Sequence, residues 1–180
     1  SIIKEIELFA RTHIFRIVAY FLRVKAQPLA LPAAPKILLI RCDKRLGNCL
    51  MSLPLFDAIR NQIEGCEISL LGHVHLRKLV APHLSIDHYL PFDKWGKDGG
   101  MGIMSTLRTI RLQSYDVVID SGNPTRHSVT QALLTRFSGA KHTLGLDHFP
   151  FGVLYTCSVA RDIKNSHDIE QRLQVLRPLL

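Results

Sequence analysis

The sequence contains no arrangement of cysteines or histidines that is typical of a metal site. It has four cysteines in 180 residues, and none of them is spaced as CxxC. Most of them fall in or beside apolar runs, where a thiol packs as a small hydrophobic group. The nine histidines form no HExxH or comparable pattern. We therefore expect no metal site and no disulfide framework.

The common nucleotide-binding fingerprints are also missing. No GxGxxG follows the first strand-like apolar run, and GxxxxGK[ST] occurs nowhere in the sequence. Without these turns, the sequence lacks the usual glycine-rich cradle for a pyrophosphate or for the phosphates of ATP. We expect no bound cofactor in this chain.

Acidic residues are scarce, and long apolar runs are absent. Lys and Arg outnumber Asp and Glu by 23 to 15, which gives a net charge of +8 and favours anionic partners. The basic residues are scattered and no nucleic-acid-binding motif is present, so we expect no nucleic acid partner. Within the first 25 residues, the longest uninterrupted apolar run is 17–22, far short of the roughly 20 residues that a membrane-spanning helix needs.

Residues 1–27 form a basic amphipathic module that is expected to be helical. Apolar residues recur in it at helical spacing from Ile2 to Leu22, and lysines and arginines are interspersed among them. Such a helix could lie on a membrane surface or pack on its own domain, and the sequence leaves both alternatives open. The three prolines of residues 28–35 predict a stiff linker.

From residue 36 onward, short apolar runs alternate with segments of helical periodicity. A run such as KILLIR at 36–41 is typical of a strand that is buried on both faces. The alternation predicts an α/β fold over residues 36–180, with a Rossmann-like parallel sheet that carries helices on both faces. The expected strands are 36–41, 66–72, 86–92, 115–120 and 141–146, and the expected helices are 50–63, 75–81, 103–112 and 128–137.

Polar segments follow three of the expected strands. In open parallel sheets, ligands bind outside the carboxyl ends of the strands. Residues 41–48, 91–97 and 120–127 should therefore line one crevice, and they are the candidate site segments.

Several short segments, taken in order, carry a family resemblance. They are KILLIRCDKRLGNCLMSLPLFDAIR, EISLLG, IDHYLPFDK, YDVVID, LLTRFSGA and HDIEQRLQVLRPL. In this order they resemble the N-terminal half of bacterial glycosyltransferase family 9, the heptosyltransferase group that builds the inner core of lipopolysaccharide. The resemblance runs from about Lys36 to the end of the chain.

The resemblance implies a fold and a function. Members of the family have the GT-B architecture, in which an N-terminal domain takes the acceptor and a C-terminal domain takes the nucleotide sugar, typically ADP-heptose. Residues 36–180 then correspond to the acceptor-binding domain, and the donor domain is absent from this sequence. The implied activity is an inverting, metal-independent sugar transfer to a lipopolysaccharide core or related glycan, at the cytoplasmic face of the bacterial inner membrane. The alternative is a noncatalytic module of the same fold that binds an anionic glycan or a lipid head.

One position departs from the family pattern. In the family, an Asp follows the glycine of the first loop and is taken to be the base that deprotonates the acceptor hydroxyl, whereas the matching residue here is Asn48. An amide cannot take up a proton at neutral pH. Asp43, which matches another acidic position of the family, is then a candidate base. Alternatively the chain is noncatalytic, or Asn48 holds an acceptor that another group deprotonates. Asn is also a preferred N-cap, so Asn48 could simply begin the following helix.

A set of polar residues is expected to bind the acceptor. They are Lys44, Arg45, Lys94, Lys97, Asn123, Arg126 and Ser128. Cations at the carboxyl ends of strands favour phosphate oxygens. The resemblance places Lys94 and Lys97 where family members carry basic acceptor-binding residues, and it matches Ser128 to a family serine at the amino end of a helix. Solvent-exposed charge and turn formation are the alternative explanations for these residues. Trp95 could stack on a sugar or pack under its loop.

Overall fold

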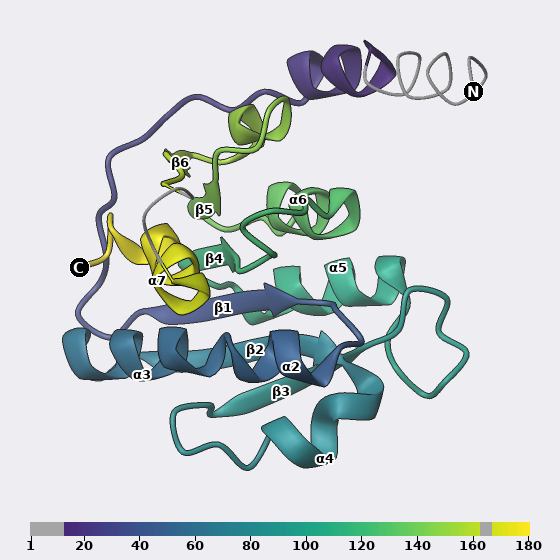
Figure 1. Cartoon of the computed structure of the whole chain (residues 1–180), viewed down its shortest axis with the longest axis vertical. Coiled ribbons are helices and arrows are strands. Elements are labelled where there is room, and N and C mark those ends of the chain that lie inside the picture. The colour runs from purple at the N-terminus through teal and green to yellow at the C-terminus, as the bar shows by residue number, and fades with distance from the viewer. Residues whose placement is uncertain (1–12, 163–166) are drawn as a thin grey trace.

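A six-stranded parallel sheet forms the centre of the protein in the computed structural model, which describes residues 13–162 and 167–180 (Figure 1). The strands lie in the order β3-β2-β1-β4-β5-β6, and every neighbouring pair is parallel. Their bounds are β1 (Lys36–Arg41), β2 (Glu67–His73), β3 (His88–Phe92), β4 (Val117–Asp120), β5 (His142–Leu146) and β6 (Cys157–Val159). The predicted Rossmann-like α/β fold is confirmed.

The apolar run of β1 reflects burial on both faces of the sheet. Residues 37–40 are each 0% exposed. Leu39 belongs to a core cluster with Phe56 on one face, whereas Leu38 packs in a cluster with Ile110 on the other face. Removing such side chains from water on both faces is the main favourable contribution to folding of the sheet.

Helices cover both faces of the sheet. Their bounds are α2 (Leu46–Leu50), α3 (Leu53–Gln62), α4 (Arg77–Val80), α5 (Ile103–Gln113), α6 (Val129–Arg136) and α7 (Asp168–Leu173), with short 3₁₀ turns η1 (Val74–Leu76), η2 (Phe151–Leu154) and η3 (Gln174–Leu176). The core cluster on one face takes side chains from α2, α3, α4, α7 and η3. The cluster on the opposite face takes side chains from α5 and α6.

The helix expected at 50–63 begins earlier and is broken in two. Helix α2 starts at Leu46, and Pro54 opens α3 within its first turn. A proline has no backbone N–H and disfavours helical geometry at the residue before it, which accounts for the break. Because Arg45 is the N-cap of α2, Asn48 lies inside the helix, and the prediction that Asn48 caps it is wrong.

The edge strand β6 was not predicted from the sequence. It spans only residues 157–159, and just one of its side chains is buried. A strand of three residues is too short to show the two-residue periodicity from which strands are inferred. It pairs with β5 and completes the sheet on the side away from β3.

The described part of the N-terminal module packs on the domain. Residues 13–21 are helical, and residues 1–12 of the predicted helix lie outside the described part of the chain. Phe15 and Leu22 pack against the small core cluster beside α6 and η2, and Ala19 is 2% exposed. Figure 1 shows the helix at the end of the molecule where η2 lies. No helix in the described residues is long and apolar enough to cross a membrane.

The proline-rich segment 28–35 runs along the domain. Leu29 and Leu31 pack against the larger core cluster. Between them, the carbonyl oxygen of Ala30 lies 3.0 Å from Nε2 of His142. The segment predicted as a linker is thus bound to the sheet through apolar and polar contacts.

Candidate functional site

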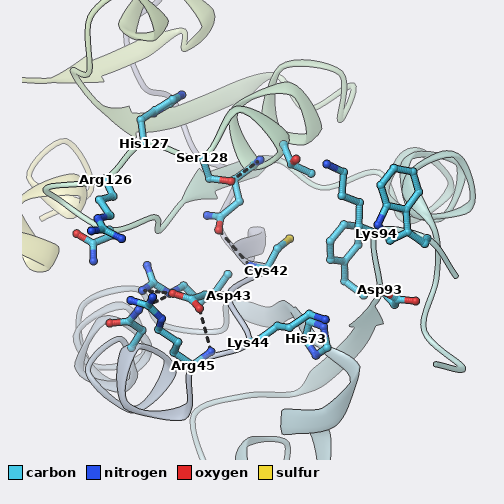
Figure 2. Close-up of a pocket in the computed structure, with 17 residues that line it drawn as sticks. Cys42, Asp43, Lys44, Arg45, His73, Asp93, Lys94, Arg126, His127 and Ser128 are labelled. Atoms are coloured by element: carbon cyan, nitrogen blue, oxygen red, sulfur yellow. Dashed lines mark hydrogen bonds and ion pairs between the residues drawn. The ribbon is translucent and has the colours of Figure 1, made fainter. Parts of the chain in front are cut away.

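A cavity of ≈450 Å³ opens at the carboxyl ends of β1 to β4. The strand order reverses between β1 and β4, and ligands of doubly wound sheets bind at such a switch point. Each of the three predicted segments, 41–48, 91–97 and 120–127, contributes side chains to the cavity wall (Figure 2). The predicted crevice is therefore present in the structure.

Asp43 is held in place by hydrogen bonds within the first loop. One carboxylate oxygen accepts from the backbone N–H of Arg45 at 2.9 Å. The other accepts from Nδ2 of Asn48 at 2.5 Å and lies 3.7 Å from Nη2 of Arg41. The amide of Asn48 thus orients the carboxylate that was predicted as an alternative base.

The environment of Asp43 favours its ionised form. Partial burial raises the pKa of this carboxyl, but the hydrogen bonds from Arg45 and Asn48 and the charges of Arg41 and Arg45 lower it, and the net shift is downward. Asp43 is therefore a carboxylate at neutral pH and can accept a proton, although a lowered pKa makes it a weaker base.

A buried network joins the ends of β1 and β4 beneath the cavity. The side-chain oxygen of Gln131 accepts from the backbone N–H of Cys42 at 3.2 Å. Its Nε2 donates to the carbonyl of Ile40 at 3.0 Å and to Asp120 at 2.9 Å. The hydroxyl of Tyr155 donates to the other oxygen of Asp120 at 2.7 Å. One α6 side chain therefore fixes the point at which the first loop leaves β1.

Two ionisable groups at this place, Asp120 of the network and Arg41 at the end of β1, are shielded from water. Burial raises the pKa of Asp120, despite the hydrogen bonds from Tyr155 and other donors. Arg41 is only 1% exposed, and its Nη1 donates to the carbonyl of Ser121 at 2.6 Å. Burial, followed by the nearby charge of Arg172, lowers the pKa of Arg41.

The amino end of α6 supplies the second wall. Ser128 is the N-cap of α6, and its hydroxyl accepts from the N–H of Gln131 at 3.4 Å. The side-chain oxygen of Asn123 accepts from the N–H of Thr125 at 2.8 Å. Both residues therefore have local structural roles, and both also line the cavity, as does the exposed Arg126.

The segment after β3 supplies the third wall. The carboxylate of Asp93 accepts from the backbone N–H groups of Lys97 at 2.6 Å and Asp98 at 3.2 Å. Lys94 lies 5.1 Å from the ring centroid of Trp95, whose side chain is 73% exposed, and both line the cavity. The structure does not place Lys97 among the lining residues, although its backbone N–H donates to Asp93, which is one of them.

His73, Thr130 and Gln131 line the cavity but lie outside the predicted segments, and Arg41 lies in the predicted segment 41–48 without having been named as a site residue. His73 ends β2, so the rule about carboxyl ends, applied to the second strand as well, would have found it. Arg41 is a charged residue at the end of an apolar strand, and this is weaker evidence that a residue belongs to the site. Gln131 lies within α6, and no pattern in the sequence distinguishes it.

Positive charge predominates in the cavity wall. The lining cations are Arg41, Lys44, Arg45, Lys94 and Arg126, and the lining carboxylates are Asp43 and Asp93. An excess of cations at the mouth of a concave site attracts anionic ligands. Among the described residues, no group of three His, Cys, Asp or Glu side chains is placed to hold a metal ion.

The strand order and the switch-point cavity define a Rossmann-like domain, and solved structures similar to it include glycosyltransferases. A family 9 glycosyltransferase from Veillonella parvula DSM 2008 superimposes with a TM-score of 0.70 and 20% identity, over 85% of this chain and 43% of that one. E. coli heptosyltransferase WaaC with ADP gives 0.64 and 18%, over 80% and 46%. E. coli ADP-heptose lps heptosyltransferase II gives 0.60 and 19%, over 78% and 39%.

These likenesses establish the fold, and they agree with the family resemblance of the sequence. No family model matches the sequence, and no curated protein sequence matches it. The chain spans less than half of the length of each of these three solved structures.

Proposed function

We propose that this chain is the acceptor-side domain of a heptosyltransferase-like glycosyltransferase. The acceptor is a phosphorylated lipopolysaccharide core or a related anionic glycan, and the donor is a nucleotide sugar such as ADP-heptose, bound outside this chain. Solved structures similar to it include two E. coli heptosyltransferases, one of them with bound ADP, and a family 9 glycosyltransferase, which supports the proposal.

The observation that carries the proposal is the cation-rich cavity around an oriented carboxylate. The cavity volume of ≈450 Å³ falls within the range of small-molecule sites, roughly 300–1,000 Å³. Lys44, Lys94 and Arg126 can pair with acceptor phosphates, and Trp95 can stack on a sugar ring. Asp43, fixed by Asn48, is the group in this wall that we assign to accept the proton of the attacking hydroxyl.

We expect Arg126→Ala to weaken acceptor binding by about tenfold or more, because a charge-assisted hydrogen bond is worth about 1.5–3 kcal/mol. Isothermal titration of the 180-residue chain with a deacylated, phosphorylated inner-core oligosaccharide measures the effect. Lys141→Ala is the control, since this exposed lysine precedes β5 and so lies at the amino end of its strand, away from the cavity at the carboxyl ends. Absence of binding by the unmodified chain, or equal loss in both variants, would refute the proposal.

We also propose that the chain works at a membrane surface, held there by the helix at 13–21. Its side chains opposite the packed face form an apolar stripe, with Ile14 and Ile17 each 59% exposed and Phe21 79% exposed. Arg16 and Arg23 flank the stripe, and residues 13–35 contain no acidic side chain. An exposed apolar face with basic flanks is typical of helices that bind anionic lipid.

The double variant Ile17→Ser, Phe21→Ser is expected to lower binding to phosphatidylglycerol-containing vesicles by at least about tenfold, since each apolar side chain buried in lipid contributes about 1.5–3 kcal/mol. Vesicle sedimentation measures the bound fraction. The control is Met104→Ser, Leu112→Ser, which removes two apolar residues of α5 that are 78% and 74% exposed. If both double variants bind alike, the helix is not the membrane anchor.

A further inference from the structure

His73 is a buried residue of the cavity wall to which the proposed function assigns no role. It ends β2, is 2% exposed, and lines the cavity together with Lys44 and Asp93. Figure 2 shows the end of the Lys44 side chain beside the His73 ring, and the charge of Lys44 acts on that ring. Lys44 itself is exposed and can move with a ligand.

The hydrogen bonds of His73 define which ring nitrogen carries the proton. Its Nδ1 accepts from the backbone N–H of His75 at 3.4 Å, in the position of an N-cap for η1. The neutral ring therefore carries its proton on Nε2. Among the described residues, this Nε2 is buried and has no hydrogen-bond partner. A buried donor without an acceptor is rare in proteins and costs free energy until an acceptor is supplied.

The two carboxylates whose charges act on His73, Asp93 and Asp98, are engaged elsewhere. Asp93 accepts from backbone N–H groups of its own loop, and Asp98 lies 3.2 Å from Nε2 of His75. Burial, followed by electrostatic interactions with Lys44 and His75, lowers the pKa of His73, and these two carboxylates only partly oppose the shift. His73 is therefore neutral at pH 7, and it presents a donor next to an ammonium group.

We propose that His73 and Lys44 form an oxyanion subsite that binds a phosphate oxygen of the acceptor. Nε2–H of His73 donates to the oxygen, and Lys44 supplies the opposite charge. The subsite rests on the proposed function, because it deepens the acceptor site of that function. In this proposal the carboxyl end of β2 recognises the charge of the acceptor, separately from Asp43 and from the residues at the amino end of α6.

NMR titration of the histidine side chains tests the subsite directly. The probes are inorganic phosphate and the inner-core oligosaccharide in its phosphorylated and enzymatically dephosphorylated forms. A bound oxyanion stabilises the imidazolium, so the pKa of His73 should rise on adding the phosphorylated forms and stay unchanged with the dephosphorylated sugar. A rise with inorganic phosphate as well identifies phosphate as the group that binds, whereas a rise with the oligosaccharide alone means that its sugar is also required.

The backbone amide signals of Arg126 and Ser128 separate the two proposals. If they shift with the phosphorylated oligosaccharide while the His73 ring does not respond, the subsite is refuted and the acceptor site stands. If neither responds, both proposals fail.

Substitution at His73 provides the second measurement. Asp and Asn both can keep the N-cap acceptor for η1, but Asp replaces the ring donor by a negative charge. His73→Asp should weaken binding of the phosphorylated oligosaccharide by about tenfold or more, with little change for the dephosphorylated one. His73→Asn, which retains an N–H donor, should lose less than His73→Asp, and exposed His75→Ala should bind normally. Equal affinities of the Asp and Asn variants would refute the subsite. If the Asp variant does not fold, the affinity of the Asn variant and the NMR titration of the unmodified chain still decide the question.

Discussion

Replacing Asp43 by Asn is expected to lower the rate of sugar transfer by about 10²–10⁴-fold, the range that a positioned general base contributes. The substitution keeps the size of the side chain, and acceptor binding should change little. The measurement is kcat for transfer from ADP-heptose to the phosphorylated inner-core acceptor, using the complete gene product. Because the pKa of Asp43 is lowered, the base is already ionised near neutral pH, and the rate should fall only in acid.

Asn48→Asp is the matched variant for this prediction. It places a second carboxylate at the position from which Asn48 now donates to Asp43 at 2.5 Å. Two carboxylates this close cannot both ionise easily, so the pair should share a proton and retain transfer activity. Full activity in Asp43→Asn would show that another group is the base. If the unmodified gene product binds the acceptor and transfers no sugar, the noncatalytic alternative is correct.

Gln131→Leu is expected to lower the free energy of unfolding by about 2–3 kcal/mol, although the new side chain is similar in size. The backbone N–H of Cys42 would lose its hydrogen bond to the Gln131 oxygen, and Asp120 would lose a donor to one of its buried oxygens. An unsatisfied buried donor costs about 1–3 kcal/mol. Ile40 should contribute little, because its carbonyl also accepts from Ser121 at 2.9 Å.

Urea unfolding measures this loss, and the slope of the unfolding free energy against urea concentration should stay unchanged. The control is Gln113→Leu, the same chemical change at an exposed position near the end of α5, which should alter stability by no more than about 0.5 kcal/mol. Acceptor affinity should fall as well in Gln131→Leu, because the network positions the first loop. A loss equal to that of the control would mean that Gln131 does not hold this loop.

The two predictions concern Asp43 and Gln131, and the sequence alone identified only Asp43 as a site residue. Asp43 follows a clear strand signal, and the rule about carboxyl ends placed it in the site. Gln131 lies within a helix whose periodicity was evident, but periodicity states only that a residue is on a helix. That its amide reaches both β1 and β4 depends on the packing of α6 against the sheet.

Asn48 shows the same limit. Its residue type suggested a helix cap, because Asn is favoured there. The structure starts α2 at Leu46, so the amide faces Asp43 instead. Helix boundaries are set by the balance of tertiary contacts and local preferences, and a single residue type does not fix them.

Local chemistry in the sequence determined most of the strands and helices, the parallel sheet and the end of the sheet at which polar loops gather. Burial of a strand on both faces and the alternation with amphipathic helices leave few other arrangements for such a chain. Tertiary structure alone decided which of the polar side chains meet. Hydrogen bonds and charges act over a few ångströms, and residues such as Arg41, His73 and Gln131 come within that range only because strands and helices far apart in the sequence pack together.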